Sequence, residues 1–146
     1  MMRRLVPAVL AVLLLGLAGC GDPIEDYCSQ LREDRKEFAE MLESESSSAL
    51  LGNLPMLHDL AEKSPDDLSD DWQTYLRAVE GLDDAIKDAG VKPSDFNGGK
   101  APAGLSKADQ QAIAEAAGQI TTEDVITAAS GIEQQARDVC KVNLGL

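Results

Sequence analysis

The chain has 146 residues, and its 26 acidic side chains outnumber the 13 basic ones to give a formal net charge of −13. A surface this acidic repels nucleic-acid phosphates, so DNA and RNA are excluded as partners. Aromatic residues make up only 3% of the chain. Helix-forming residues are abundant and strand-favouring ones scarce, which predicts one small all-α domain.

The first 19 residues have the organisation of a secretory signal peptide. Arg3 and Arg4 precede an apolar run over residues 5–17, which is too short to span a membrane as a helix. The residues that follow, in the sequence Leu17-Ala18-Gly19-Cys20, resemble the bacterial lipobox. That resemblance implies cleavage before Cys20 and a diacylglyceryl thioether on its sulfur. A plain signal peptide with a chance cysteine is the alternative.

A lipid on Cys20 predicts a chain anchored in the cell membrane, on its extracytoplasmic face. Such a modification places two or three acyl chains, palmitate among them, on one residue, which is enough for stable anchoring. We therefore expect a lipoprotein signal peptide at 1–19, a lipid anchor and short linker at 20–23, and a helical domain at 24–146. The membrane, reached through Cys20, is the first predicted partner.

Two further cysteines, Cys28 and Cys140, remain after Cys20 is lipidated. Outside the cytosol an even pair of cysteines predicts a disulfide, and two cysteines allow only one connectivity. A redox-active pair is the alternative, but such pairs are usually close in sequence, as in C-x-x-C. We expect a structural Cys28–Cys140 disulfide that closes a loop over nearly the whole domain.

Apolar residues recur at three- and four-residue steps through most of the domain, which is typical of helices with one buried face. The pattern predicts four long helices near 24–43, 49–63, 66–89 and 122–141. Gly52, Asn53 and Pro55 predict a kink or a late start in the second helix. Thr121 or Thr122 is expected to cap the last helix.

Residues 90–105, GVKPSDFNGGKAPAGL, break every periodic pattern and predict the longest loop of the chain. Ser106 is expected to cap a short helix near 107–118. Small residues in the last two helices allow close helix approach; these are Ala112, Ala114, Ala128, Ala129 and Gly131.

The expected disulfide constrains how these helices are arranged. Cys28 lies near the start of the first helix and Cys140 near the end of the last, and an even number of antiparallel helices brings those two ends together. The sequence therefore predicts an antiparallel bundle of four long helices, with one short helix lying across the far end in the 90–120 connection.

No residue pattern predicts a catalytic, cofactor or metal site. His58 is the single histidine and lacks a partner motif such as H-E-x-x-H, so we interpret it as an exposed or core-edge residue. Four aspartates, Asp66, Asp67, Asp70 and Asp71, suit a helix N-terminus and lack the calcium-loop spacing. Phe96 is an aromatic residue in the predicted loop and is a candidate partner contact.

Three stretches of the domain resemble the small helical lipoproteins of actinobacteria. They are Asp26-Tyr27-Cys28 at a helix start, SPDDLSDDWQTYLRAVEGLDDAIKDAG over 64–90, and ARDVC over 136–140. The resemblance covers most of residues 24–141 and implies location and fold. It supplies no catalytic residues.

These patterns together predict a membrane-anchored extracytoplasmic lipoprotein that is not an enzyme. Its expected function is binding or interaction with an unknown protein of the cell envelope. The alternative is a carrier that holds a lipid or apolar small molecule within the helical bundle, since bundle interiors can form ligand cavities. An enzyme of unfamiliar type is the third possibility, and it requires convergent carboxylates in a cleft.

Overall fold

A computed structural model describes residues 22–44, 46–96 and 100–146. The predicted signal peptide, the anchor Cys20 and the start of the linker lie outside the described residues. The described part is all-helical, as the composition predicts, and contains no strand. Its elements are α1 (Pro23–Glu43), α2 (Ser47–Gly52), α3 (Leu54–Lys63), η1 (Asp66–Leu68), α4 (Ser69–Asp88), η2 (Pro93–Asp95), α5 (Lys107–Ile120) and α6 (Glu123–Asp138).

Local sequence signals explain where several helices begin. The Asp22 side chain accepts a hydrogen bond from the backbone N–H of Ile24, and Pro23 occupies the first helical position of α1. Ser106 caps α5 as predicted, because its hydroxyl accepts from the N–H of Asp109 at 3.1 Å. Thr122 occupies the N-cap position of α6 but makes no side-chain cap bond, because its hydroxyl donates to the carbonyl of Gln119 instead.

The predicted second helix is two helices. α2 ends at Gly52, and α3 begins at Leu54 with Pro55 in its first turn. Pro55 lacks a backbone N–H and is tolerated only in the first turn of a helix. The helix is therefore interrupted at Asn53, as the kink prediction anticipates. The predicted third helix begins at Ser69, and Asp66–Leu68 form a separate 3-10 turn before it.

The helix α4 is the central helix of the fold and packs against α2, α3, α5 and α6. It contributes seven buried residues to the core (Trp72, Tyr75, Leu76, Ala78, Val79, Leu82 and Ile86). Trp72 is almost fully buried, and its indole N–H donates to the hydroxyl of Tyr27 on α1 at 3.1 Å. Burial raises the pKa of Tyr27 to about 12, so this phenol is neutral and can accept the bond. The pair joins two helices across the core.

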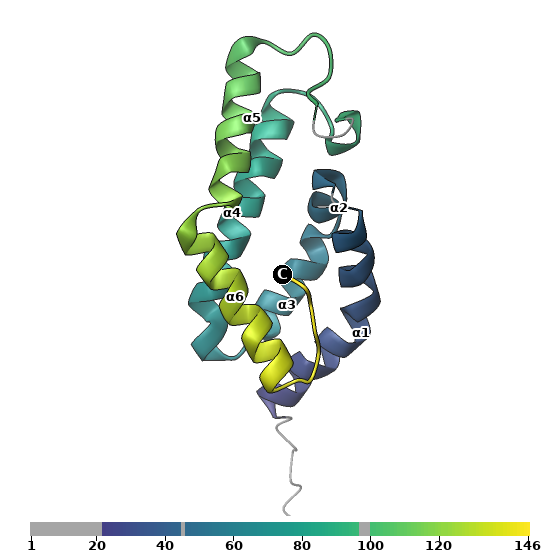
Figure 1. Ribbon diagram of the computed structural model, residues 1–146, viewed down its shortest axis with the longest axis vertical. Helices are drawn as coiled ribbons and strands as arrows, with labels where there is room; N and C mark the ends of the chain where they lie inside the picture. Colours follow the sequence, from purple (N-terminus) through teal and green to yellow (C-terminus); the bar gives the residue numbers. More distant parts are fainter. Residues whose placement is uncertain (1–21, 45, 97–99) are drawn as a thin grey trace, which may run out of the picture.

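The two C-terminal helices both pack along α4 (Figure 1). α6 lies beside the N-terminal half of α4, and α5 lies beside the C-terminal half. α5 has 14 residues and runs alongside α4, which differs from the short helix that the sequence predicts across the end of a bundle. At the α4–α6 contact, a Cβ added to Gly131 would overlap the Asp71 carboxylate, so the small side chain permits this approach as predicted.

The last residues form a packed extended segment that the sequence does not predict. α6 ends at Asp138, three residues before the expected end, and residues 139–146 turn back along the fold (Figure 1). Val142 and Leu144 are buried in the core. The buried carboxylate of Glu133 accepts hydrogen bonds from the backbone N–H groups of Leu144 and Gly145, at 3.0 and 2.9 Å.

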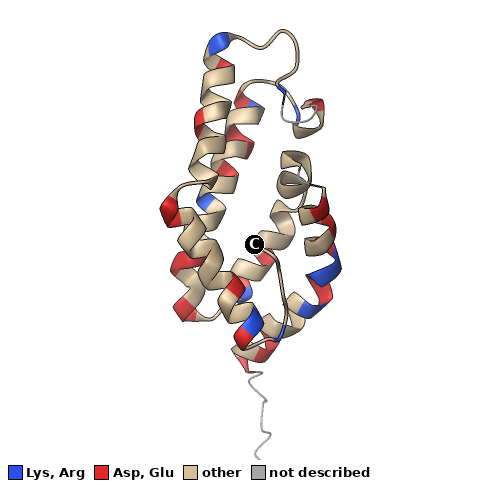
Figure 2. Cartoon of the chain, in the orientation of Figure 1, with Lys and Arg blue, Asp and Glu red and all other residues tan. Residues whose placement is uncertain are grey.

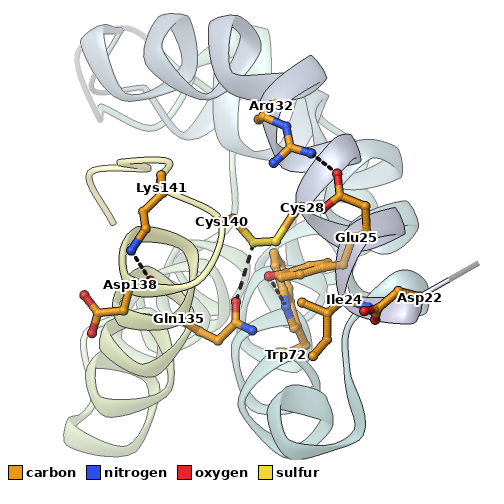
Figure 3. Close-up of a disulfide and its surroundings, with 11 residues drawn as sticks. Asp22, Ile24, Glu25, Cys28, Arg32, Trp72, Gln135, Asp138, Cys140 and Lys141 are labelled. Atoms are coloured by element: carbon orange, nitrogen blue, oxygen red, sulfur yellow. Dashed lines mark hydrogen bonds and ion pairs between the residues drawn. A yellow bond between two sulfur atoms is a disulfide. The ribbon is translucent and has the colours of Figure 1, made fainter.

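The predicted disulfide is confirmed. Cys28 and Cys140 are bonded, with their Cα atoms 4.9 Å apart and both residues buried (Figure 3). The bond joins the first turns of α1 to the segment that follows α6. The start of α1 and the end of α6 therefore meet at one end of the fold, opposite the start of α5 (Figure 1).

Candidate ligand pocket

A pocket of about 630 Å³ opens between α4, α5 and the start of α2. Its lining comes from the C-terminal half of α4, from α5 and from the start of α2, and in Figure 1 the start of α5 lies at the end of the fold opposite the start of α1. The described residues that line it are Ser44, Ser46, Ser47, Leu82, Ile86, Phe96, Ala101, Gln110, Ile113, Ala114 and Ala117. Its volume falls within the range of small-molecule sites, about 300–1,000 Å³.

The pocket exists because α5 presents small residues toward the rest of the domain. Ile113 is the one buried residue of α5, while Ala114 and Ala117 line the pocket and remain exposed. Leu82 and Ile86 of α4 form the opposite, buried part of the wall. With alanines at these positions, α5 packs closely on α4 but does not fill the space toward α2.

The loop after α4 closes one side of this space. Ser48 of α2 donates a hydrogen bond to the carbonyl of Pro93 at 2.6 Å, which ties the loop to α2. The backbone N–H of Lys92 donates to the carboxylate of Asp95 at 2.8 Å and stabilises the η2 turn. Phe96 directly follows this turn and is half-buried against the core. The predicted partner contact is therefore a pocket residue.

The lining has a mixed apolar and hydroxyl character. Leucine, isoleucine, phenylalanine and alanine side chains form most of it, and three serines with Gln110 supply the polar groups. None of the described lining residues carries a charge. This contrasts with the acidic helix surfaces elsewhere (Figure 2). Such a mixed lining is of the kind that holds small molecules with both apolar and polar groups.

Sequence reasoning finds Phe96 but misses most of the pocket. Ser44, Ser46 and Ser47 look like ordinary helix-ending residues, and Gln110 looks like a surface residue of a short helix. The sequence predicts only that the small side chain of Ala114 allows close helix approach. The serine-rich run between two helices, residues 44–48, is the one sequence feature that could have indicated polar residues at the edge of a pocket.

The other residues singled out from the sequence do not form a second site. His58 is half-exposed, and its Nε2 lies 3.0 Å from a carboxylate oxygen of Glu80. The aspartates at 66–71 lie at the start of α4, where burial and the neighbouring Asp70 raise the pKa of Asp71. Among the described residues, no three histidine, cysteine or acidic side chains are placed to hold a metal ion.

Comparison with known proteins supplies no relative for this chain. No protein-family model, no curated protein and no solved structure matches it. Within the described residues, no helix has the length and apolar character needed to cross a membrane.

Proposed function

We propose that this protein is a lipid-anchored protein on the extracytoplasmic face of the cell membrane and acts by binding. The observation that carries the anchoring is the sequence Leu17-Ala18-Gly19-Cys20, which ends two positions before the first described residue, Asp22. The Cys28–Cys140 disulfide supports a location outside the cytosol, since structural disulfides persist in oxidising compartments.

The surface around the disulfide is suited to face a bilayer. Ile24 and Val139 are two large hydrophobic residues that remain exposed, at 42% and 49%. Ile24 lies one helical turn before Cys28 (Figure 3), and Val139 directly precedes Cys140 in the sequence. Exposed apolar side chains beside the expected lipid support a domain that rests close to the membrane with this end toward it.

Lipid labelling tests the anchoring. Cells that express the full chain are fed a clickable palmitate analogue, and we expect the label on the protein together with partition into the detergent phase of Triton X-114. Cys20→Ser should abolish both results, whereas Cys140→Ser serves as the control cysteine and should keep the label. A labelled Cys20→Ser variant, or an unlabelled wild-type chain, would refute the anchoring.

A carrier role is the second candidate, and the pocket between α4 and α5 favours it. A protein that holds a small apolar molecule needs a concave, mostly apolar and largely preformed site. Native mass spectrometry of the exported Cys20→Ser chain, which lacks the lipid, should show a bound small molecule if the carrier role is correct. A stoichiometric protein partner after membrane cross-linking, with no bound small molecule, supports interaction with an envelope protein instead.

We also propose that the helices near the disulfide act as an antiparallel four-helix bundle of the type found in small actinobacterial lipoproteins. The contacts of α1 with α3, of α3 with α4 and of α4 with α6 support this arrangement. The bundle is a rigid support for the pocket, which lies beyond it along α4.

A further inference from the structure

We propose that the end of the domain that carries the disulfide docks directly on the extracytoplasmic surface of the bilayer, with the side chains of Ile24 and Val139 inserted among the lipids. This inference deepens the proposed anchoring by naming the protein surface that touches the membrane, and therefore rests on it. The lipid on Cys20 holds the chain at the bilayer, and the two inserted side chains fix which face of the domain is turned toward it.

The exposed apolar side chains of the domain are concentrated beside the disulfide. Among the described residues, three large hydrophobic side chains are exposed: Ile24 at 42%, Ile126 at 54% and Val139 at 49%. Ile24 precedes Cys28 by one helical turn, on the same face of α1 (Figure 3). Val139 directly precedes Cys140 in the sequence. Single exposed apolar residues are common on protein surfaces, but two of these three flank one cross-link.

The cross-link keeps Ile24 and Val139 close together in space. The Cα atoms of Cys28 and Cys140 are 4.9 Å apart. Four residues of helix separate two Cα atoms by about 6 Å, and neighbouring Cα atoms lie about 3.8 Å apart. The Cα atoms of Ile24 and Val139 are therefore separated by at most about 15 Å. Ile126 lies near the other end of α6, about 18 Å away along the helix axis.

The proposed lipid lies close enough to this patch to bring it to the bilayer. Cys20 precedes Ile24 by four residues in the sequence, and four fully extended residues span at most about 14 Å. A tether this short gives the patch a high effective concentration at the membrane surface. The transfer of two apolar side chains out of water is then enough to favour one orientation of the domain.

The charged side chains at this end support an apolar contact rather than an electrostatic one. The Arg32 guanidinium pairs with the Glu25 carboxylate at 2.6 Å, and the ammonium of Lys141 donates to the backbone carbonyl of Asp138 at 2.6 Å (Figure 3). These two basic groups are engaged within the chain. The formal net charge of −13 also opposes attraction to anionic lipid heads. Because salt screens charges and leaves apolar burial in place, docking should be insensitive to moderate salt.

Docking is measured on the mature chain, residues 20–146, exported behind a cleavable signal so that the disulfide forms. The thiol of Cys20 is coupled in vitro to a maleimide-bearing lipid in phosphatidylcholine vesicles. A second phosphatidylcholine in the bilayer carries a photoreactive diazirine on its acyl chain, and mass spectrometry maps the labelled residues. We expect labelling at Val139 to exceed labelling at Ile126 at least fivefold, both at about 0.1 M and at about 0.5 M salt. Both positions are far from Cys20 in the sequence, so the tether itself does not produce the difference.

Two substitutions form a matched pair. Ile24→Ser removes one inserted side chain and should lower the labelling at Val139 at least threefold. Ile126→Ser removes an exposed isoleucine near the other end of α6, and it should change the labelling at Val139 less than twofold. Because both isoleucines are exposed, both variants should keep the circular dichroism spectrum of the wild type, which is checked before coupling.

Several results would overturn the inference. They are equal labelling at Val139 and Ile126, labelling at Val139 that falls severalfold with added salt, or an Ile24→Ser variant that is labelled like the wild type. Because the lipid is attached to Cys20 chemically, a failure of the anchoring in cells leaves this assay unaffected. Conversely, a chain that cells lipidate but that shows no preferred labelling at Val139 refutes the docking surface alone.

Discussion

Glu133 is the only charged residue classed as buried among the described residues, and its function is structural. One carboxylate oxygen accepts both hydrogen bonds from the C-terminal segment, and the other lies 3.5 Å from the Arg137 guanidinium. Hydrogen bonds to a charged acceptor are stronger than neutral ones. Glu133 therefore satisfies two backbone N–H groups that would otherwise lie unpaired beside the core.

Replacing this carboxylate should release the C-terminal segment. We expect Glu133→Ala to lower the free energy of unfolding by about 1–3 kcal/mol, because two N–H groups lose their acceptor. Urea denaturation followed by circular dichroism measures the change. Gln134→Ala, at the exposed neighbouring position of α6, is the control and should stay within about 0.5 kcal/mol of the wild type. Equal effects of the two substitutions would contradict this role.

Asp71 gives a prediction on pH dependence. Partial burial, followed by the charge of Asp70, raises its pKa in the folded protein. The protonated form therefore favours folding, and its contribution to stability is present below the ordinary Asp pKa, about 3.9, and lost as the pH rises through the folded-state value. We expect Asp71→Asn to raise the melting temperature at pH 7 and to give no gain at pH 3.

A matched control separates this effect from loss of the helix dipole interaction. Asp71 and Asp124 both lie in the first turn of a helix, where a negative charge is favourable. Asp124 is exposed, so Asp124→Asn should lower the melting temperature slightly at pH 7. A decrease of the same size in both variants would show that burial of Asp71 has no effect on stability.

At the scale of elements, α5 is the least firmly held long helix. Ile113 is its single buried residue, whereas α4 has seven and α6 has five. Few buried apolar contacts lower the free energy of local opening. We expect backbone amides of α5 to exchange with deuterium at least tenfold faster than those of α4, as measured by mass spectrometry.

The sequence predicts long amphipathic helices better than it predicts irregular segments. The helices at 24–43 and 122–141 are found with their starts within a residue, because their apolar stripes and first-turn residues agree. The C-terminal segment is missed, since Val142 and Leu144 alternate with polar residues over too few positions to form a pattern. The length of α5 is underestimated, because most of the apolar residues in this helix are alanines. Alanine is only weakly hydrophobic, so it contributes little to the periodic apolar pattern from which a helix is predicted.

At the scale of the whole molecule, the disulfide links the two ends of the domain. The cross-link joins residues 112 positions apart, so it restricts the unfolded chain strongly. We expect the Cys28→Ala/Cys140→Ala double variant to lose about 2–5 kcal/mol of stability. Thermal unfolding with and without a reductant measures this loss. The reductant should lower the melting temperature of the wild type and leave the double variant unchanged; a wild type insensitive to full reduction would contradict the prediction.

The molecule also has two functionally different ends. The Cys28–Cys140 disulfide joins α1 to the segment after α6, whereas the pocket is lined by the C-terminal half of α4, through Leu82 and Ile86. If Cys20 carries the lipid, a molecule bound in the pocket is held away from the anchoring membrane.

The sequence by itself determined the all-α class, most helix positions and the Cys28–Cys140 pairing, because these depend on apolar periodicity and on a count of cysteines. The lipid anchor stays a prediction of the sequence alone. Only the tertiary structure decided the direction of α5, the packing of residues 139–146 and the existence of the pocket. The pocket arises where α4, α5 and α2 fail to fill the space between them, and such a space depends on how helices are placed rather than on the residues of any one of them.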